Sequence, residues 1–321
     1  MTDPGEGPDR SGPAATGIAL AVLSAGSFGT SGIFGSALVH SGWSPAAATT
    51  ARLAAPAFLL AVPAVLQLRG RWTLFRRQAA RVVIYGLVAM AGAQLFYFEA
   101  IESIPIGIAL LLEYLGVVLV VGWLWAVRGE RPRRLTVAGV VTAITGLILL
   151  IGVAGSSRLS PAGITWGLLS AVSLATYFLV SAADSGKALP PLAMAWGGMC
   201  AGASGLAVAG AAGVVPLTAH AGDVALLHHR VSWVVPVLEL SLVATVVPYV
   251  AGIAAARRLG AKLASFIGIG EVLFATLYAW LLLDQLPSAT QFTGGAFILA
   301  GVILVHVDEN RRWPARPRRR C

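Results

Sequence analysis

Charge is scarce in this sequence. Only 12% of its 321 residues are Asp, Glu, Lys or Arg, whereas 57% are hydrophobic and the mean hydropathy is +0.80. A soluble domain of this length carries about 25% charged residues, because it must present a wetted surface. The low charge therefore excludes a soluble globular protein and predicts an integral membrane protein.

Cysteine and the short motifs of enzyme chemistry are also lacking. Cys200 lies within an apolar run and Cys321 ends the chain, so they provide neither a disulfide framework nor a metal site. Residues 185–187 read Ser-Gly-Lys but lack the rest of a phosphate-binding loop, and no Gly-x-Ser-x-Gly or His-Glu-x-x-His occurs. We therefore expect no enzyme activity, no cofactor, no metal and no ATP-driven pumping.

Long apolar runs make up most of the chain. Each run of about 20 residues can cross a ~30 Å hydrocarbon core as a helix, and none shows the period-2 alternation of barrel strands. The sequence therefore predicts an all-α integral membrane protein with ten transmembrane helices. The predicted helices are 16–39, 45–67, 82–101, 105–127, 135–154, 162–182, 191–213, 233–255, 263–283 and 290–307.

The segments outside these spans are predicted to be tails and loops. Residues 1–15 are rich in Asp, Gly and Pro and read as a disordered cytoplasmic tail, and residues 308–321 as a basic cytoplasmic tail. The connection 214–232 holds three histidines, His220, His228 and His229. We expect it to be a solvated loop rather than a metal site.

The net charge of +9 comes from short basic clusters between the apolar runs. With ten spans and the N-terminus in the cytoplasm, twenty of the twenty-three Lys and Arg residues fall inside, and only Arg158 and Arg230 fall outside. Such asymmetry sets membrane orientation, so both termini are predicted to be cytoplasmic. The basic residues thus indicate topology and not a nucleic-acid partner.

An internal repeat is visible. The pattern Leu-Ser-Ala-x-Ser-x-x-Thr at 23–30 recurs at 169–176. Near the ends of the two halves, at a constant offset of 155, the matched pairs are Pro132 and Pro287, Gly139 and Gly294, and Gly146 and Gly301. Five helices in each half predict two repeats of opposite orientation, 16–154 and 162–307, which places a binding site near the midplane between them.

The sequence resembles the drug/metabolite transporter superfamily in its EamA-type branch. The similarity rests on Ile-Pro-Ile-Gly at 104–107, Leu-Glu-Tyr-Leu-Gly at 112–116, Glu271, Trp-Leu-Leu-Leu at 280–283, and the glycines Gly294 and Gly301. The fourth span is similar to that of the threonine/homoserine exporter group. This resemblance implies ten helices, export of metabolites or amino acids, and two four-helix groups that rock while the fifth and tenth helices support them.

Five ionisable residues lie within the predicted spans: Arg52, Glu99, Glu113, Glu239 and Glu271. Each costs at least ~2.5–3.5 kcal/mol near the bilayer centre, so such residues usually serve a function. Glu113 and Glu271 each lie eight residues into their spans, roughly 12 Å deep, from opposite faces. We expect them to carry protons or to bind a substrate amine. The alternative is that they stabilise irregular helix segments as protonated acids.

Arg52 lies at about the same depth as Glu113. We therefore predict that the two residues pair when the cavity is empty. The alternative is that Arg52 extends to the outer headgroups without a partner.

Further polar and aromatic side chains are candidates for the wall of the cavity. For all of them the alternative is packing or an interfacial belt. The candidates are Gln94, Tyr97, Glu239, Tyr249, Thr30, Thr176, Tyr177, Trp166 and Trp196, with Glu99 and Glu102 at the outer mouth.

These observations predict a secondary transporter for a small polar metabolite, an amino acid or an amine, working by alternating access. Export from a bacterial cytoplasmic membrane is the preferred direction, driven by protons or by the substrate's own gradient. Import, a lipid flippase, a lipid-processing enzyme and a membrane scaffold are the alternatives. The expected partners are the small-molecule substrate, protons and the lipid bilayer, and a homodimer is left open.

Overall fold

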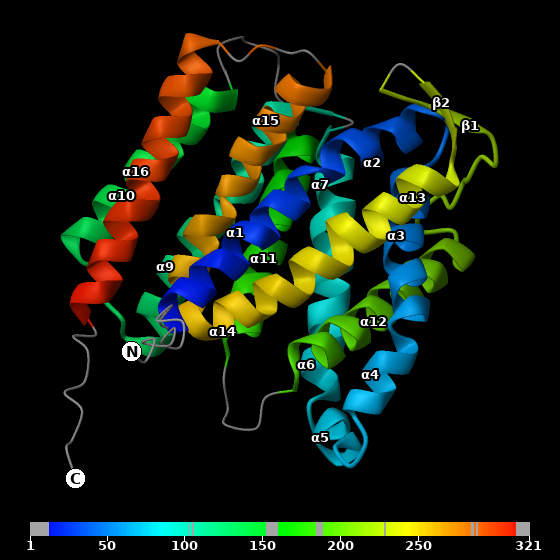
Figure 1. Cartoon of the computed structure of the whole chain (residues 1–321), viewed down its shortest axis with the longest axis horizontal. Coiled ribbons are helices and arrows are strands. Elements are labelled where there is room, and N and C mark those ends of the chain that lie inside the picture. Colours follow the sequence, from blue (N-terminus) through cyan, green and yellow to red (C-terminus); the bar gives the residue numbers. More distant parts are fainter. Residues whose placement is uncertain are drawn as a thin grey trace, which may run out of the picture.

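The structure, a computed structural model, describes residues 13–101, 103–104, 106–151, 160–183, 189–227, 229–283, 286 and 288–312. Over these residues the chain forms a helical bundle with one short hairpin, which confirms the helical class (Figure 1). In chain order the elements are α1 (Pro13–Gly29), α2 (Ser31–His40), α3 (Pro45–Leu59), α4 (Ala61–Gln67), α5 (Trp72–Arg77), α6 (Ala79–Ile84), the π-helix η1 (Tyr85–Gly92), α7 (Ala93–Ile101), α8 (Ile106–Tyr114), α9 (Gly116–Arg128), α10 (Arg134–Ile151), α11 (Pro161–Ala182), α12 (Pro191–Ala211), β1 (Asp223–Leu226), β2 (His229–Ser232), α13 (Val234–Ser241), the π-helix η2 (Leu242–Val246), α14 (Val247–Gly268), α15 (Gly270–Leu283) and α16 (Ala289–Arg312).

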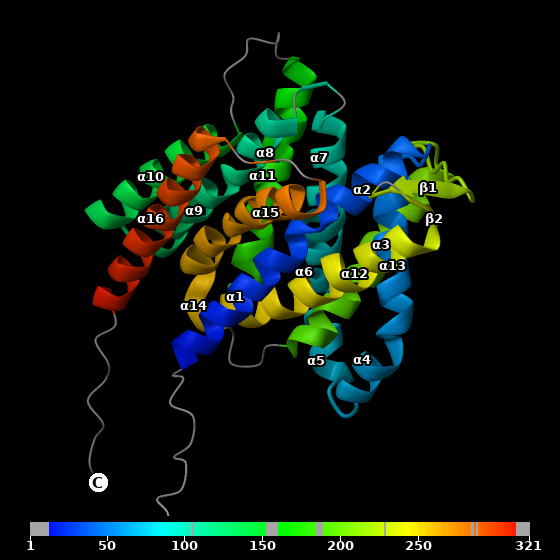
Figure 2. The ribbon, with the colours of Figure 1, turned by 45° about the horizontal axis from the view of Figure 1, so that its top comes forward.

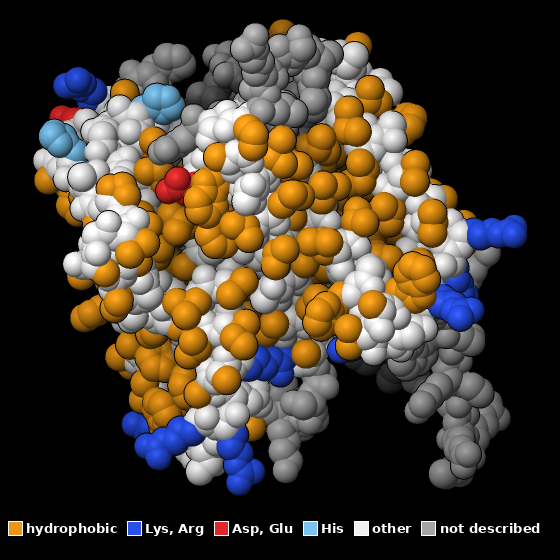
Figure 3. Space-filling view, turned by 180° about the vertical axis from the view of Figure 1, so that it is seen from behind, with side chains coloured by type: hydrophobic (Ala, Val, Ile, Leu, Met, Phe, Trp, Pro, Cys, Tyr) orange, Lys and Arg blue, Asp and Glu red, His pale blue; other side chains and the backbone are white. Residues whose placement is uncertain are grey.

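The helices are those of a multi-pass membrane protein. Among the described residues, seven helical stretches are long and apolar enough to cross a membrane, and an eighth counts if α3 and α4, bent by 54°, form one span. α10 and α15 are apolar but shorter. Hydrophobic side chains cover the sides of the bundle, and Lys and Arg gather at one end (Figure 3). We call this end, which carries α5, the basic end.

Parts of two predicted spans fall within α14, which consists of two helices joined at Gly260. The φ of 80° and ψ of 162° at Gly260 are not helical and suit only glycine. The chain therefore turns at Gly260, at the basic end. The next irregularity comes at Ile269, which separates α14 from α15.

The connection after α12, predicted to be a solvated loop, contains a short hairpin. Residues Asp223–Leu226 and His229–Ser232 pair as an antiparallel hairpin, with Asp223 opposite Ser232. Val224 is buried against Leu38 and Trp43 of the α2–α3 region. Burial of alternate residues in β1 stabilises the hairpin, which covers the end of the bundle opposite the basic end (Figure 1). His228 lies outside the described residues, and no cluster of metal ligands occurs among the described ones.

Corresponding helices of the two sequence halves make corresponding contacts. The hydroxyl of Ser24 on α1 donates to the carbonyl of Pro248 on α14, at 2.9 Å. The hydroxyl of Ser170 on α11 donates to the carbonyl of Ala93 on α7, at 3.1 Å. The two acceptors lie one and two residues after the π-helices, η1 and η2, that interrupt these spans. Each half thus contains a span widened by a π-helix at its hydrogen-bonded crossing.

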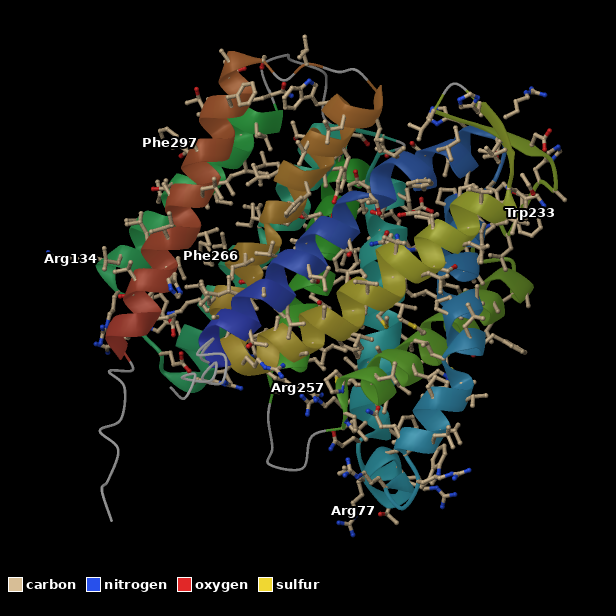
Figure 4. All side chains as sticks on the ribbon, in the orientation of Figure 1. Arg77, Arg134, Trp233, Arg257, Phe266 and Phe297 are labelled. Carbon is tan, nitrogen blue, oxygen red and sulfur yellow. The ribbon has the colours of Figure 1, made fainter. Side chains whose placement is uncertain are left out.

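α10 and α16 pack along a seam of glycines. A Cβ added to Gly146 would come within 2.6 Å of the Gly294 carbonyl, and one added to Gly139 within 2.9 Å of the Gly301 carbonyl. The backbones therefore touch, as in close helix packing in membranes. In Figure 4, Phe266 lies between this pair and the rest of the bundle, whereas Phe297 points away from the bundle.

Alanine at Gly294 is expected to destabilise the protein by about 1–3 kcal/mol, because its Cβ would meet the backbone of α10 at Gly146 and Leu150. Thermal unfolding in detergent, followed by circular dichroism, measures the effect. Gly122→Ala is the matched control, since nothing lies within 4 Å of its added Cβ. Equal melting temperatures for the two variants would contradict a close backbone contact between α10 and α16 at Gly294.

The last helix extends beyond its predicted end at residue 307 and reaches Arg312. The extension is explained by buried polar contacts. Asp308 accepts a hydrogen bond of 2.5 Å from Thr136 of α10, and Glu309 forms an ion pair with Lys262 of α14. The beginning of the chain differs less: α1 begins at Pro13, and the predicted disordered tail falls mostly in residues 1–12, outside the described part.

Candidate functional site

A cavity of about 140 Å³ lies among α1, α2, η1, α7, α8, α11, α14 and α15. At one end its lining includes the exposed Gly32 and the partly exposed Gln94 and Tyr97. At the other end Ala21 and Ala264 are buried. The cavity therefore opens toward the end that carries α2 and the hairpin, which is turned forward in Figure 2, and is closed toward the basic end.

Two carboxyl groups line this cavity, and each lies beside a break in its helix. Glu113 comes two residues before the break at Leu115, and Glu271 two residues after the break at Ile269. At both breaks the backbone switches to short i→i−3 hydrogen bonds, from the amides of Leu115 and Val272. Local departures from α-helical hydrogen bonding of this kind leave backbone polar groups beside the two carboxyl groups.

The two glutamates lie within electrostatic reach of each other. Glu271 interacts with the hydroxyl of Tyr114, and Glu113 with the hydroxyl of Ser170. Neither carboxyl group has an ion-pair partner within 4 Å among the described residues. The cavity therefore holds two acidic groups that no side-chain cation neutralises by direct contact.

Aromatic rings line one side of the cavity, which we call the floor. Phe28, Tyr177 and Tyr249 belong to it, and Tyr85 packs against the last two. Tyr85, Tyr177 and Tyr249 are each at most 4% exposed. The hydroxyl of Tyr177 is buried beside Gly252 and Ser24. The floor is therefore aromatic and tightly packed.

Arg52 does not pair with Glu113, which corrects the prediction from depth. Its Nη1 donates to the Oε1 of Gln94 at 2.7 Å and its Nε to the Oγ1 of Thr245 at 3.0 Å. Its Nη2 donates to the carbonyl of Ala244, inside η2, at 2.7 Å. The alternative of an extension to the headgroups is also wrong, because Arg52 is only 3% exposed. Arg52 thus joins α3, α7 and η2 behind the cavity wall, of which Gln94 is a part.

Lysine at Arg52 is expected to lower the free energy of unfolding by about 2–4 kcal/mol. A single ammonium group cannot donate in the three directions that the planar guanidinium group of Arg52 serves. The carbonyl of Ala244, or the side chain of Gln94, would lose its donor. Chemical denaturation in detergent measures the loss. Thr245→Val, which removes one acceptor only, is expected to cost less, and a larger cost for Thr245→Val would contradict this account.

Thr30 and Glu239 form their own pair outside the cavity lining. The hydroxyl of Thr30 lies 2.5 Å from the Oε1 of Glu239 and 2.9 Å from the carbonyl of Ser27. Thr30 occupies the break between α1 and α2, which explains why it reaches α13. Its repeat counterpart Thr176 lies in the unbroken α11 and donates only to the carbonyl of Val172 on its own helix. The prediction that Thr176 lines the cavity is therefore wrong.

Both tryptophan candidates also lie away from the cavity. Trp166 stacks on Phe96 at 5.6 Å, and Trp196 donates to the carbonyl of Ala57 at 2.9 Å. For both residues the alternative, a role in packing instead of in the cavity wall, therefore agrees with the structure. Glu99, at the predicted mouth, lies near the end of α7 and does not line the cavity, and Glu102 lies outside the described residues.

Six of the predicted residues meet in the cavity: Gln94, Tyr97, Glu113, Tyr177, Tyr249 and Glu271. The sequence analysis missed Ser24, Phe28, Tyr114 and Phe178, which also line it. Ser24 belongs to the repeated pattern at 23–30, and Tyr114 directly follows Glu113, so both carried a signal. Phe28 and Phe178 are ordinary apolar residues of apolar helices and carried none.

Comparison with known proteins agrees with this architecture. The chain is 26% identical over 246 residues to an uncharacterized inner membrane transporter, YicL, of Salmonella typhimurium, a match that covers 74% of this chain and 76% of that protein. It is 27% identical over 208 residues to an uncharacterized transporter of Archaeoglobus fulgidus, covering 65% of this chain and 70% of that one. A chain of known crystal structure, 20% identical, shares the fold with a TM-score of 0.70 over 96% of this chain and 100% of its own.

The sequence profile of the EamA-like transporter family matches twice, at residues 15–152 and 161–307. Both named relatives are uncharacterized transporters. Because the two matches cover most of its length, the chain belongs to the EamA-like transporter family.

Proposed function

We propose that this membrane transporter is a secondary carrier that moves a small polar, amine-bearing solute out of the cell by alternating access. One observation carries the proposal: Glu113 and Glu271 share a cavity with no ion-pair partner among the described residues. Two neighbouring carboxylates in a low-dielectric site cannot both remain charged without compensation. The cavity therefore takes up protons or a cationic group, and exchanging one for the other couples transport to a proton gradient.

The architecture proposed is ten spans in two inverted repeats, residues 16–154 and 162–307. The two π-helices and the matched hydrogen bonds of Ser24 and Ser170 support it. The seam supports it as well, because Gly139 meets Gly301 while Gly146 meets Gly294, the pattern of a pseudo-twofold contact. The double match to one family profile agrees with a duplication.

The orientation proposed places the basic end in the cytoplasm, and with it both termini. The gathering of Lys and Arg at that end supports this placement. The inner membrane location of the YicL relative supports a bacterial cytoplasmic membrane. In this orientation the cavity opens to the outside, and the buried residues around Ala21 and Ala264 separate it from the cytoplasm.

Alternating access would proceed by rocking of the helices around Glu113 and Glu271, with α10 and α16 as a rigid support. Opening to the cytoplasm requires the buried residues around Ala21 and Ala264 to separate. An outward-open cavity serves export and import equally, so direction needs its own measurement. Efflux remains the proposal, with import of a small metabolite as the alternative.

Flux in proteoliposomes tests the proposal. Purified protein is reconstituted with an internal pH dye, and a panel of amines and amino acids is added outside at a set pH gradient. Solute-dependent proton movement absent from protein-free vesicles supports the carrier. Its absence for every solute, together with labelling of single-cysteine variants that places the two termini on opposite faces, would overturn it.

A further inference from the structure

The lining of the cavity has an unusual chemical balance. Its only charged side chains are the acidic Glu113 and Glu271, and no Lys, Arg or His lines it among the described residues. Arg52, the nearest buried cation, is held behind Gln94 by three hydrogen bonds. A negatively charged group entering this cavity would meet two acids and no exposed cation.

Aromatic rings form the other half of the lining. Phe28, Tyr177 and Tyr249 lie in nearly perpendicular planes, at 82° for Phe28 with Tyr177, 85° for Phe28 with Tyr249 and 78° for Tyr177 with Tyr249. Their centroids are 5.1–6.4 Å apart. The three rings pack edge to face, and all three residues also line the cavity, so ring surface is available there to attract an alkylammonium group through cation–π interaction.

The acids lie close to these rings. Glu271 acts electrostatically on both Tyr177 and Tyr249, and Glu113 acts on Tyr249, which Arg52 also influences from behind the cavity wall. A cation inside the cavity, on the side of the two acids, is therefore stabilised by the carboxylates. The polar rest of the lining, which includes Ser24, Gln94 and Tyr97, offers hydrogen bonds to a small head group.

We infer that the cavity binds organic cations that carry an amine or quaternary ammonium group and no carboxylate, and that it rejects zwitterionic amino acids. This inference rests on the proposed carrier function and narrows its substrate class. The ammonium group is held by Phe28, Tyr177 and Tyr249 and neutralised by Glu113 and Glu271. A carboxylate on the same molecule is repelled by the acids and finds no cationic partner in the described lining.

Three matched ligands test the inference: phenethylamine, phenylalanine and 2-phenylethanol. The first two differ only by a carboxylate, and the first and third only by the charged nitrogen. Isothermal titration calorimetry on the purified full chain is expected to show phenethylamine binding about tenfold more tightly than either of the others. Equal or tighter binding of phenylalanine, equal binding of 2-phenylethanol, or no binding of phenethylamine would each overturn it.

Variants of the floor provide the second measurement, the ratio of phenethylamine affinity to 2-phenylethanol affinity, which does not depend on the folded fraction. Tyr249→Leu is expected to lower this ratio about fivefold, whereas Tyr249→Phe keeps the ring and changes it less than about twofold. Tyr278→Leu is the control, because Tyr278 stacks on Phe274 and does not line the cavity. An unchanged ratio in Tyr249→Leu would overturn the aromatic site.

The outcome separates the substrate class from the carrier function. If phenylalanine binds and drives proton movement in the vesicles while phenethylamine does neither, the cation inference fails and the carrier stands. If phenethylamine binds but no solute drives flux, the cation site stands and the carrier fails.

Discussion

Glutamine at both Glu113 and Glu271 is expected to reduce proton-coupled flux in proteoliposomes by about a hundredfold, to the level of protein-free vesicles. The two carboxyl groups are the only titratable acids that line the cavity among the described residues. Glutamine has nearly the shape of glutamate but can neither bind nor release a proton. Substrate could still enter the cavity, but nothing would link its movement to protons.

The single variants separate the roles of the two acids. If one glutamate carries the proton and the other binds the amine, Glu113→Gln and Glu271→Gln will differ, one losing coupling and the other losing affinity. Glu130→Gln is the control, since Glu130 lies in the connection between α9 and α10, away from the cavity. Flux within about twofold of the native protein in the double variant would remove the basis of the proposed mechanism.

Alanine at Gly252 is expected to destabilise the protein by about 2 kcal/mol and to disturb the closed floor. The added Cβ would coincide with the hydroxyl of Tyr177 and would lie 2.9 Å from the Oγ of Ser24 and 3.1 Å from the Cζ of Tyr177. Tyr177 is surrounded by Phe28, Tyr85 and Tyr249, so it has little room to move away. The floor must therefore open partly or unfold locally.

A double-mutant cycle isolates this contact. Tyr177→Phe removes the oxygen that the Cβ would strike, so Gly252→Ala should cost less than about 1 kcal/mol in that background. Melting temperatures of the four proteins, measured in one detergent, give the coupling. Additive effects of the two substitutions would mean that Gly252 is required for some reason other than Tyr177.

The helical architecture was predictable because hydropathy and charge report it directly. Apolar runs bounded by arginines gave the positions of the helices to within a few residues in most cases. The interruptions were harder to foresee. Thr30, at the break, lies between Gly29 and Ser31, whereas Thr176 lies between Ala175 and Tyr177 in the unbroken α11, but one glycine does not by itself predict a break. Thr30 reaches Glu239 of α13, whereas Thr176 bonds only within its own helix.

The site was predictable where a residue type is rare in lipid. Glu113 and Glu271 stood out because buried acids are costly, and both line the cavity. Arg52 stood out for the same reason, but its partners did not, because a neutral amide, a hydroxyl and a carbonyl freed by a π-helix are not visible as a charge pattern. The hairpin at 223–232 was not predicted, because strands of four residues are too short for their sequence pattern to be distinguished from that of a polar loop.

Polar side chains connect α16 to other helices at one of its ends. Asp308 and Glu309 secure it to α10 and α14 at the basic end, whereas near Ala289 the polar contacts of Ser288 with Thr290 and Gln291 stay within the first turn of α16 itself. Local opening of this helix should therefore start at the residues nearest Ala289 and stop before Val305, which is fully buried. Amide hydrogen exchange along α16 is then expected to slow steadily from its beginning to its end, because the free energy of local opening increases toward the basic end.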